Sequence, residues 1–232
     1  MTSSRPMARD YCWSCRRPKS ACLCPSLPPM ETRTRIVLLM HPMEWKREKC
    51  TTGRLACLNL ANSEIIPGIA FDDNPRYRAL VDDPHNYSML LYPGEGAVDL
   101  GREPFPRELL GGRRLLVFLI DATWACARAV ARESPGLMAL PRLMFTPREK
   151  SRWIIKRQPA EWCLSTLEAA HELLISLEES GLDEYPDRDR LLEVFARMQD
   201  YQVERRESDG QPRHLSARRE RAARRALPRN LA

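Results

Sequence analysis

The chain has 232 residues, 43% of them hydrophobic, which is enough for the core of one ordinary domain. No apolar run approaches the roughly 20 residues of a membrane span. Residues 1–6 are polar and lack the apolar core of a signal peptide, so we expect a cytoplasmic protein with no membrane partner. The net charge is +6, and residues 205–232, with nine arginines and three acidic residues, carry all of that excess. A nucleic-acid partner would be attracted to this tail, and we infer no obligate protein partner.

Four cysteines lie close together before residue 25, as Cys12-x2-Cys15 and Cys22-x-Cys24. The segment around them is too polar and too short to fold by burying apolar surface. Four thiolates from two short knuckles suit tetrahedral zinc, although the second pair is spaced more tightly than usual. Four protein ligands leave no open coordination position, so we expect a structural zinc knuckle; free or redox-active thiols are the alternative.

Apolar runs and helical patterns alternate along the rest of the chain. Strands are predicted at residues 35–40, 64–70, 88–91, 115–120 and 140–145, and helices at 48–61, 74–81, 125–132, 169–180 and 191–201. The run at 115–120 has no polar alternation, which is typical of a strand buried on both faces. We therefore predict an α/β fold: a mostly parallel sheet with helices on both faces. The predicted divisions are a zinc-binding segment and linker (1–29), a main domain (30–204) and an Arg-rich tail (205–232) that is disordered or helical only when bound.

Polar motifs follow three of the predicted strands: His41-Pro42-Met43-Glu44, Tyr92-Pro93-Gly94 and Asp121-Ala122-Thr123-Trp124. Open α/β sheets bind their ligands at the carboxyl ends of their strands, so these motifs are candidates for chemistry. Each also has a structural explanation: a hydrogen-bonded histidine, a Pro-Gly turn, and a helix cap made by Asp121 or Thr123. No G-x-G-x-x-G motif and no P-loop is present, which leaves dinucleotide and NTP binding unsupported.

Two further motifs precede the 169–180 helix. Residues 148–157 mix basic side chains with a tryptophan, as a phosphate-contacting surface does; a solvated strand edge is the alternative. Ser165-x-x-Glu168 fits a capping box, and a helix start alone would account for both side chains.

Taken together and in order, these motifs resemble the DTW-domain family. The namesake Asp-x-Thr-Trp is residues 121–124, and the His-Pro-x-Glu element is residues 41–44, with Thr52-Gly53 following. The Leu-Tyr-Pro-Gly element is similar to residues 91–94, and the Cys-Leu-Ser-Thr-Leu-Glu-Ala element to residues 163–169. The cysteine cluster is also similar to the family's, and the resemblance spans roughly residues 12–200.

The resemblance implies a knotted SPOUT-like fold and a tRNA-uridine aminocarboxypropyltransferase activity. In that reaction the 3-amino-3-carboxypropyl group of S-adenosylmethionine moves to N3 of a tRNA uridine (acp3U formation), with the variable loop as the expected location. Residues 30–204 would be the catalytic domain. A SPOUT-like tRNA or rRNA methyltransferase and a non-catalytic zinc-containing RNA-binding protein remain alternatives.

This chemistry suggests roles for the motif residues. The uridine N3–H is a weakly acidic imide, and a carboxylate at the end of a buried strand has its pKa raised by desolvation, so Asp121 is the expected base. Trp124 would pack against the sulfonium or the target base. The full expected set is: catalytic, Asp121, Thr123 and Trp124; S-adenosylmethionine-binding, Leu91, Tyr92, Pro93, Gly94, Leu164, Ser165 and Thr166; RNA-contacting, His41, Glu44, Arg148, Lys150, Arg152, Lys156 and Arg157; zinc-binding, Cys12, Cys15, Cys22 and Cys24.

Overall fold

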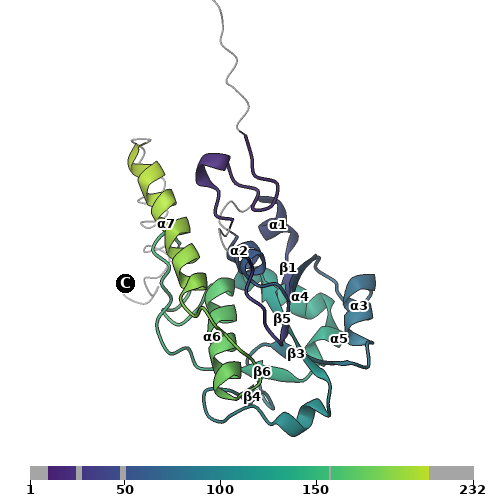
Figure 1. Ribbon diagram of the computed structural model, residues 1–232. Helices are drawn as coiled ribbons and strands as arrows, with labels where there is room; N and C mark the ends of the chain where they lie inside the picture. Colours follow the sequence, from purple (N-terminus) through teal and green to yellow (C-terminus); the bar gives the residue numbers. More distant parts are fainter. Residues whose placement is uncertain (1–9, 25–27, 48–50, 157, 209–232) are drawn as a thin grey trace, which may run out of the picture.

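The protein is built on one six-stranded parallel sheet (Figure 1). The computed structural model describes residues 10–24, 28–47, 51–156 and 158–208. The strand order is β2-β1-β5-β3-β6-β4, so β1 and β5 lie side by side inside the sheet. The strands are β1 (Arg35–Met40), β2 (Ser63–Pro67), β3 (Asn86–Leu91), β4 (Val98–Asp99), β5 (Arg114–Asp121) and β6 (Arg142–Met144).

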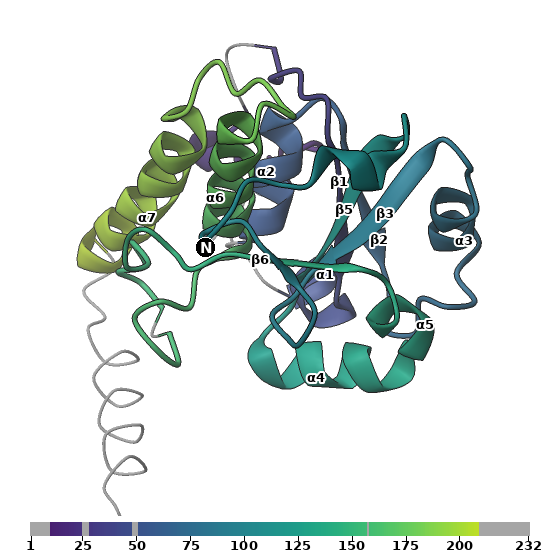
Figure 2. The same cartoon turned by 90° about the horizontal axis from the view of Figure 1, so that it is seen from below.

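Helices cover both faces of this sheet (Figure 2). One face packs against α2 and α6, which α7 covers in turn, and the other face packs against α3, α4 and α5. Leu38 and Val117 point into the first layer, whereas Val37 and Phe118 point into the second. The helices are α1 (Pro42–Arg47), α2 (Thr52–Asn59), α3 (Pro75–Val81), α4 (Trp124–Glu133), α5 (Pro135–Met138), α6 (Thr166–Glu179) and α7 (Arg190–Ser208), with 3-10 turns η1 (Lys19–Ala21) and η2 (Arg107–Leu110).

The central strands explain why the predicted fold class is correct. Successive side chains of a strand point to opposite faces, and here both faces are covered, so β1 and β5 are apolar without alternation. The α/β fold with a parallel sheet and helices on both faces is confirmed. The knotted SPOUT-like topology stays a prediction.

Two elements differ from the sequence-based expectation in ways that affect the site. The helix predicted at 48–61 is α2 (Thr52–Asn59), with residues 48–50 outside the described residues, and a helix that was not predicted, α1, begins before it at Pro42. Proline suits the first position of a helix, where its missing N–H costs nothing. In addition, β5 extends to Asp121, so this residue ends the strand and does not lie in the turn that follows it.

The cysteine-bearing segment packs on the main domain (Figure 1). Leu23 is buried in the same core layer as α2 and α6, and Met30 forms a parallel bridge with Leu60. At the other end, α7 continues to Ser208, beyond the helix predicted at 191–201, while residues 209–232 of the predicted tail lie outside the described residues. The three-part division of the chain stays a prediction.

Candidate active site and cysteine cluster

The carboxyl ends of β1 and β5 bring Asp121 beside His41. Met40 pairs with Asp121 in the sheet register, and the His41 backbone N–H donates to the Asp121 carbonyl at 3.0 Å. The Asp121 side chain is only 5% exposed. Its Oδ1 accepts a hydrogen bond of 2.6 Å from the Thr166 hydroxyl, whereas its buried Oδ2 has no hydrogen-bond partner in the described structure. A buried carboxylate oxygen without a partner is costly unless a ligand uses it.

Two helices begin at this carboxylate. Thr166 is the first residue of α6, and Gly53 is the second residue of α2. A Cβ atom on Gly53 would lie 2.8 Å from Cγ of Asp121 and closer still to Oδ2, distances that real side chains do not show. Glycine is therefore needed at position 53 because the backbone of α2 passes directly against the carboxylate.

Burial raises the pKa of Asp121 above its ordinary value. Desolvation penalises the charged form, and the Thr166 hydrogen bond and the positive charges of Lys156 and Arg54 act in the opposite direction. A carboxylate held in this way is a stronger base than an exposed aspartate. It can take a proton from a weakly acidic group that comes within hydrogen-bond reach.

The other two residues of the Asp-x-Thr-Trp motif occupy the start of α4. Thr123 is the N-cap, and its hydroxyl accepts from the Cys126 N–H at 3.4 Å. The capping alternative thus describes Thr123, whereas the Asp121 carboxylate bonds across the sheet edge to α6. Trp124 is 45% exposed and offers an aromatic face to a ligand.

His41 and Glu44 are both buried, so neither presents a broad surface to a macromolecule. His41 Nδ1 accepts from the Met43 N–H at 3.2 Å, which caps the short helix α1. This bond is the structural alternative that the sequence left open for His41. Contact of either residue with RNA stays a prediction.

The Leu-Tyr-Pro-Gly motif lies at the same sheet edge as Asp121. Leu91 ends β3, which pairs with β5, and the Tyr92 N–H donates to the Leu143 carbonyl at 2.9 Å. Gly94 has a positive φ of 158°, and a Cβ there would collide with the Arg142 guanidinium. Pro93 and Gly94 are exposed, so their backbone is accessible to a ligand.

The Leu164-Ser165-Thr166 segment divides its side chains between two tasks. Ser165 forms the predicted capping box with Glu168: its hydroxyl accepts from the Glu168 N–H at 3.2 Å, and the Glu168 carboxylate accepts from the Ser165 N–H at 2.8 Å. The Glu168 carboxylate also accepts hydrogen bonds from the Ser151 hydroxyl and the Arg152 N–H, so it anchors the loop that contains these two residues. Thr166 is the member of this segment that reaches Asp121.

The predicted basic stretch at 148–157 is an irregular loop whose cations are largely paired. Arg148 makes a two-pronged salt bridge to Glu179, Lys150 pairs with Glu161, and Arg152 pairs with Glu149. A hollow of about 140 Å³ beside this loop is also lined by Glu168 and Glu172. The surface is therefore of mixed charge and not uniformly basic. Of the remaining cations, Lys156 lies over the Trp153 ring at 5.3 Å, and Arg157 lies outside the described residues. Leu164, expected to bind the donor, is half-buried.

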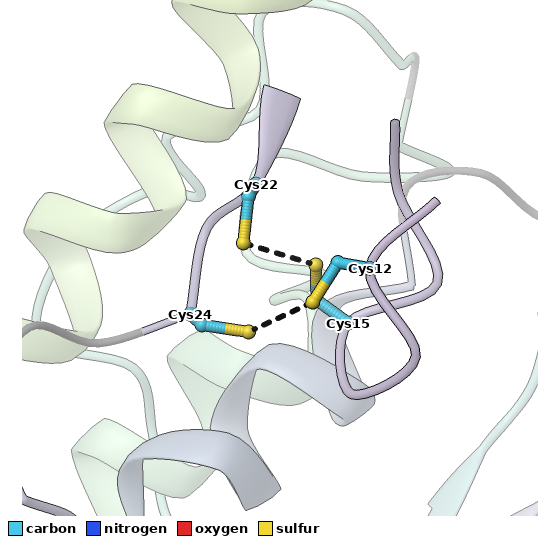
Figure 3. Close-up of side chains that lie close together, drawn as sticks. All are labelled: Cys12, Cys15, Cys22 and Cys24. Carbon is cyan, nitrogen blue, oxygen red and sulfur yellow. Dashed lines mark hydrogen bonds between the residues drawn. The ribbon is translucent and has the colours of Figure 1, made fainter. Parts of the chain in front are cut away.

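The four predicted metal ligands come together in one cluster, with their sulfur atoms turned toward one another (Figure 3). The sulfur atoms of Cys12 and Cys24 are 3.5 Å apart, and those of Cys15 and Cys22 are 3.7 Å apart. All four sulfurs lie within 4.8 Å of one another. Zinc–sulfur bonds of about 2.3 Å in a tetrahedron place sulfurs about 3.8 Å apart. Backbone hydrogen bonds, first from the Cys15 N–H, lower the pKa of Cys12 to about 6, which favours its thiolate, whereas burial and the neighbouring cysteines raise the pKa of Cys24. The cluster could hold a metal ion.

Arg54, near the site, was missed by the sequence analysis. Arg54 follows Gly53 in α2, is only 8% exposed, and places its guanidinium 4.3 Å from the centre of the Trp45 ring. Arg16, from the knuckle between the cysteine pairs, lies over the same ring at 4.1 Å. An arginine in a helical segment gives no sign of burial in its own sequence, so the burial of Arg54 was not predictable.

These motifs build a parallel α/β domain. It has a buried carboxylate at the end of a central strand and an appended four-cysteine cluster. The chain belongs to the DTW domain family, which matches residues 9–203. It is 34% identical over 184 residues to tRNA-uridine aminocarboxypropyltransferase 2 of Drosophila melanogaster, covering 77% of this chain and 70% of that protein. The mouse protein of the same name is 30% identical over 177 residues, covering 75% of this chain and 58% of the mouse protein.

A plant relative extends this set: tRNA-uridine aminocarboxypropyltransferase A of Arabidopsis thaliana is 27% identical over 197 residues, covering 75% of this chain and 74% of the plant protein. No solved structure matches the chain. None of the helices that the structure describes has the length and apolar character that crossing a membrane requires.

Proposed function

We propose that this protein transfers the 3-amino-3-carboxypropyl group of S-adenosylmethionine to N3 of a uridine in tRNA. The family and the names of the relatives support the reaction class. The observation that carries the proposal is the Asp121 carboxylate, buried at the end of a central strand, with an Oδ2 that has no hydrogen-bond partner among the described residues.

The proposed step is a single displacement in which charge and atoms balance. The uridine N3 electron pair forms a bond to the γ-carbon of the methionine moiety, and the N3 proton passes to the Asp121 carboxylate. The bond between that carbon and the sulfonium sulfur breaks, and its electron pair stays on sulfur as a neutral thioether. The sulfonium is already a good leaving group, so the protein's main contributions are a base and the orientation of the γ-carbon.

The remaining site residues would hold the reactants. Thr166 orients the Asp121 carboxyl through their 2.6 Å hydrogen bond. The accessible backbone of Tyr92, Pro93 and Gly94, together with the Leu164–Thr166 segment, would hold the donor. Trp124, exposed beside Asp121 in sequence, would stack on the uridine. Thr123 would support this arrangement as the cap of α4.

Binding of the tRNA would involve basic groups outside this pocket. Exposed ion pairs such as Lys150–Glu161 and Arg152–Glu149 are worth little in water, so both cations can exchange a carboxylate for a phosphate. The Arg-rich tail would add sequence-independent attraction. The four-cysteine cluster would hold a structural zinc ion that fixes the knuckle carrying Arg16.

Nucleoside analysis tests the proposal. The full-length protein is incubated with S-adenosylmethionine and an unmodified tRNA transcript, and the digested nucleosides are analysed by mass spectrometry. We expect an aminocarboxypropyl adduct on uridine with the parent protein and none with Asp121→Asn, while S-adenosylmethionine still raises the unfolding temperature of the variant. A methyl adduct would favour the methyltransferase, and absence of any donor binding would favour the non-catalytic RNA-binding protein.

A further inference from the structure

The start of α2 differs from the starts of the other helices beside Asp121. The N-cap residues of α4 and α6, Thr123 and Ser165, each accept a backbone N–H through their side chains. Thr51, the N-cap of α2, makes no such bond in the structure, and Gly53 contributes no side chain that would cover the helix end. The first N–H groups of a helix attract negative charge when they are left without acceptors.

A buried arginine with an unused donor lies at the same helix end. Arg54 is 8% exposed, and its Nη2 atom is buried without a hydrogen-bond partner within the described ranges. Helical side chains lean toward the N-terminus of their helix, so the Arg54 guanidinium extends along the uncapped turn. Leaving a buried charged donor unpaired is expensive, and this cost points to a ligand.

The contact with Trp45 does not satisfy the buried Nη2 donor of Arg54. The guanidinium carbon lies 4.3 Å from the ring centre, within the range of a cation–π contact. Its N–H donors lie in the plane of the guanidinium and remain able to bind a carboxylate in a two-pronged manner. Arg16, over the same ring at 4.1 Å, adds a second positive charge.

The charges around Arg54 also favour the binding of an anion. Burial lowers the pKa of Arg54, and the neighbouring Arg16 charge lowers it further, so both factors disfavour the unpaired cation. The charge of Asp121 raises the pKa of Arg54, and Arg54 in turn lowers the pKa of Asp121. An anionic group bound to Arg54 would restore the balance of charge beside the base.

We propose that Arg54 and the first N–H groups of α2 bind the α-carboxylate of S-adenosylmethionine. The inference rests on the proposed function, because it assigns one end of the donor in that reaction. The carboxylate is the donor's only anionic group, and a guanidinium that is only 8% exposed suits a small carboxylate better than a polynucleotide phosphate. Anchoring this group next to Asp121 fixes the short carbon chain that carries the γ-carbon, which a methyl transfer would not require.

Three ligands and two variants test the assignment by calorimetric titration of the full chain. S-adenosylmethionine carries the carboxylate, whereas decarboxylated S-adenosylmethionine and 5′-methylthioadenosine lack it. Arg54→Gln removes the charge, and Arg113→Gln is the matched control, because Arg113 also lies over an aromatic ring, Tyr87 at 4.6 Å, but next to the amino end of β5.

We expect Arg54→Gln to weaken S-adenosylmethionine binding by about 10- to 100-fold, the range for a hydrogen bond to a charged group. Binding of 5′-methylthioadenosine should stay unchanged, and Arg113→Gln should bind all three ligands as the parent does. The parent itself should bind decarboxylated S-adenosylmethionine more weakly by a similar factor. That last comparison needs no variant, so it holds even if Arg54→Gln does not fold.

Other outcomes overturn the assignment in distinguishable ways. Equal affinity of the parent for S-adenosylmethionine and its decarboxylated form would remove the carboxylate from this pocket while leaving the proposed function intact. Unchanged donor binding by Arg54→Gln, with weaker tRNA binding and a flatter salt dependence, would assign Arg54 to an RNA phosphate instead. A parent protein that binds no S-adenosylmethionine would overturn the proposed function and this inference together.

Discussion

The contact between Gly53 and Asp121 gives a sharp test of the site, through the variant Gly53→Ala. The added Cβ would lie 2.8 Å from Cγ of Asp121 and 3.1 Å from Cδ1 of Leu38. Carbon atoms in contact prefer about 3.5–4.0 Å, so the carboxylate must move by about 1 Å. A displacement of that size at a reacting group costs about 100-fold in rate, which is the loss of turnover we expect.

The effect of the same variant on stability combines two opposing contributions. Alanine is favoured over glycine within a helix by about 1 kcal/mol, whereas overpacking costs about 1–3 kcal/mol. We therefore expect Gly53→Ala to lower the free energy of unfolding by up to about 2 kcal/mol. In an Asp121→Ala background the carboxylate atoms are gone and only the 3.1 Å contact with Leu38 remains, so the same glycine replacement should destabilise the protein less.

Chemical denaturation of the four proteins of this double-mutant cycle gives the coupling between positions 53 and 121. Turnover is measured on the parent and Gly53→Ala as aminocarboxypropyl uridine formed per unit time. Normal turnover of Gly53→Ala, together with the same change in stability in both backgrounds, would refute the close approach of α2 to the carboxylate.

Three further predictions concern the base, a helix start and the cysteine cluster. Because burial raises the pKa of Asp121, the stabilisation from its protonated form is complete below about pH 3.9 and is lost as the pH rises through the folded-state value. The unfolding temperature of Asp121→Asn should therefore rise relative to that of the parent as the pH increases above about 3.9, and a constant difference would contradict the raised pKa. Ser165→Ala should lower the free energy of unfolding by about 1 kcal/mol. Thr123→Ala, whose cap bond is longer at 3.4 Å, should cost less in the same denaturation assay, and the reverse order would count against the capping box. Chelation of the metal, or Cys12→Ser, should lower both the metal content and the unfolding temperature, whereas an unaffected unfolding curve would argue against a structural metal.

Much of the fold could be predicted because its signals are local. Residues 35–40 were predicted as a strand and form β1, since a strand covered on both faces is apolar at every position. The capping box at Ser165 also depends on neighbouring residues only. The two-residue strand β4 was missed because so short a strand has no periodicity to detect.

The site was predictable in its parts but not in its contacts. Asp121 could be singled out as a carboxylate after a buried strand, yet its hydrogen bond to Thr166 joins residues 45 positions apart in the chain. The salt bridge between Arg148 and Glu179 also joins distant parts of the chain. Arg148 was expected to contact RNA, and in the structure it pairs with a carboxylate of α6. Tertiary packing decides which charged side chains pair, and a local sequence pattern does not predict these pairs.

Label transfer tests the central proposal, that the Asp121 site moves the aminocarboxypropyl group to a tRNA uridine, most directly. Unmodified tRNA is incubated with S-adenosylmethionine carrying the label either in its carboxyl carbon or in its methyl carbon, using the parent protein and Asp121→Asn in parallel. We expect the parent to place the carboxyl label, and not the methyl label, in a uridine of the tRNA, and Asp121→Asn to place neither. Transfer of the methyl label, or undiminished transfer by Asp121→Asn, would contradict the proposal.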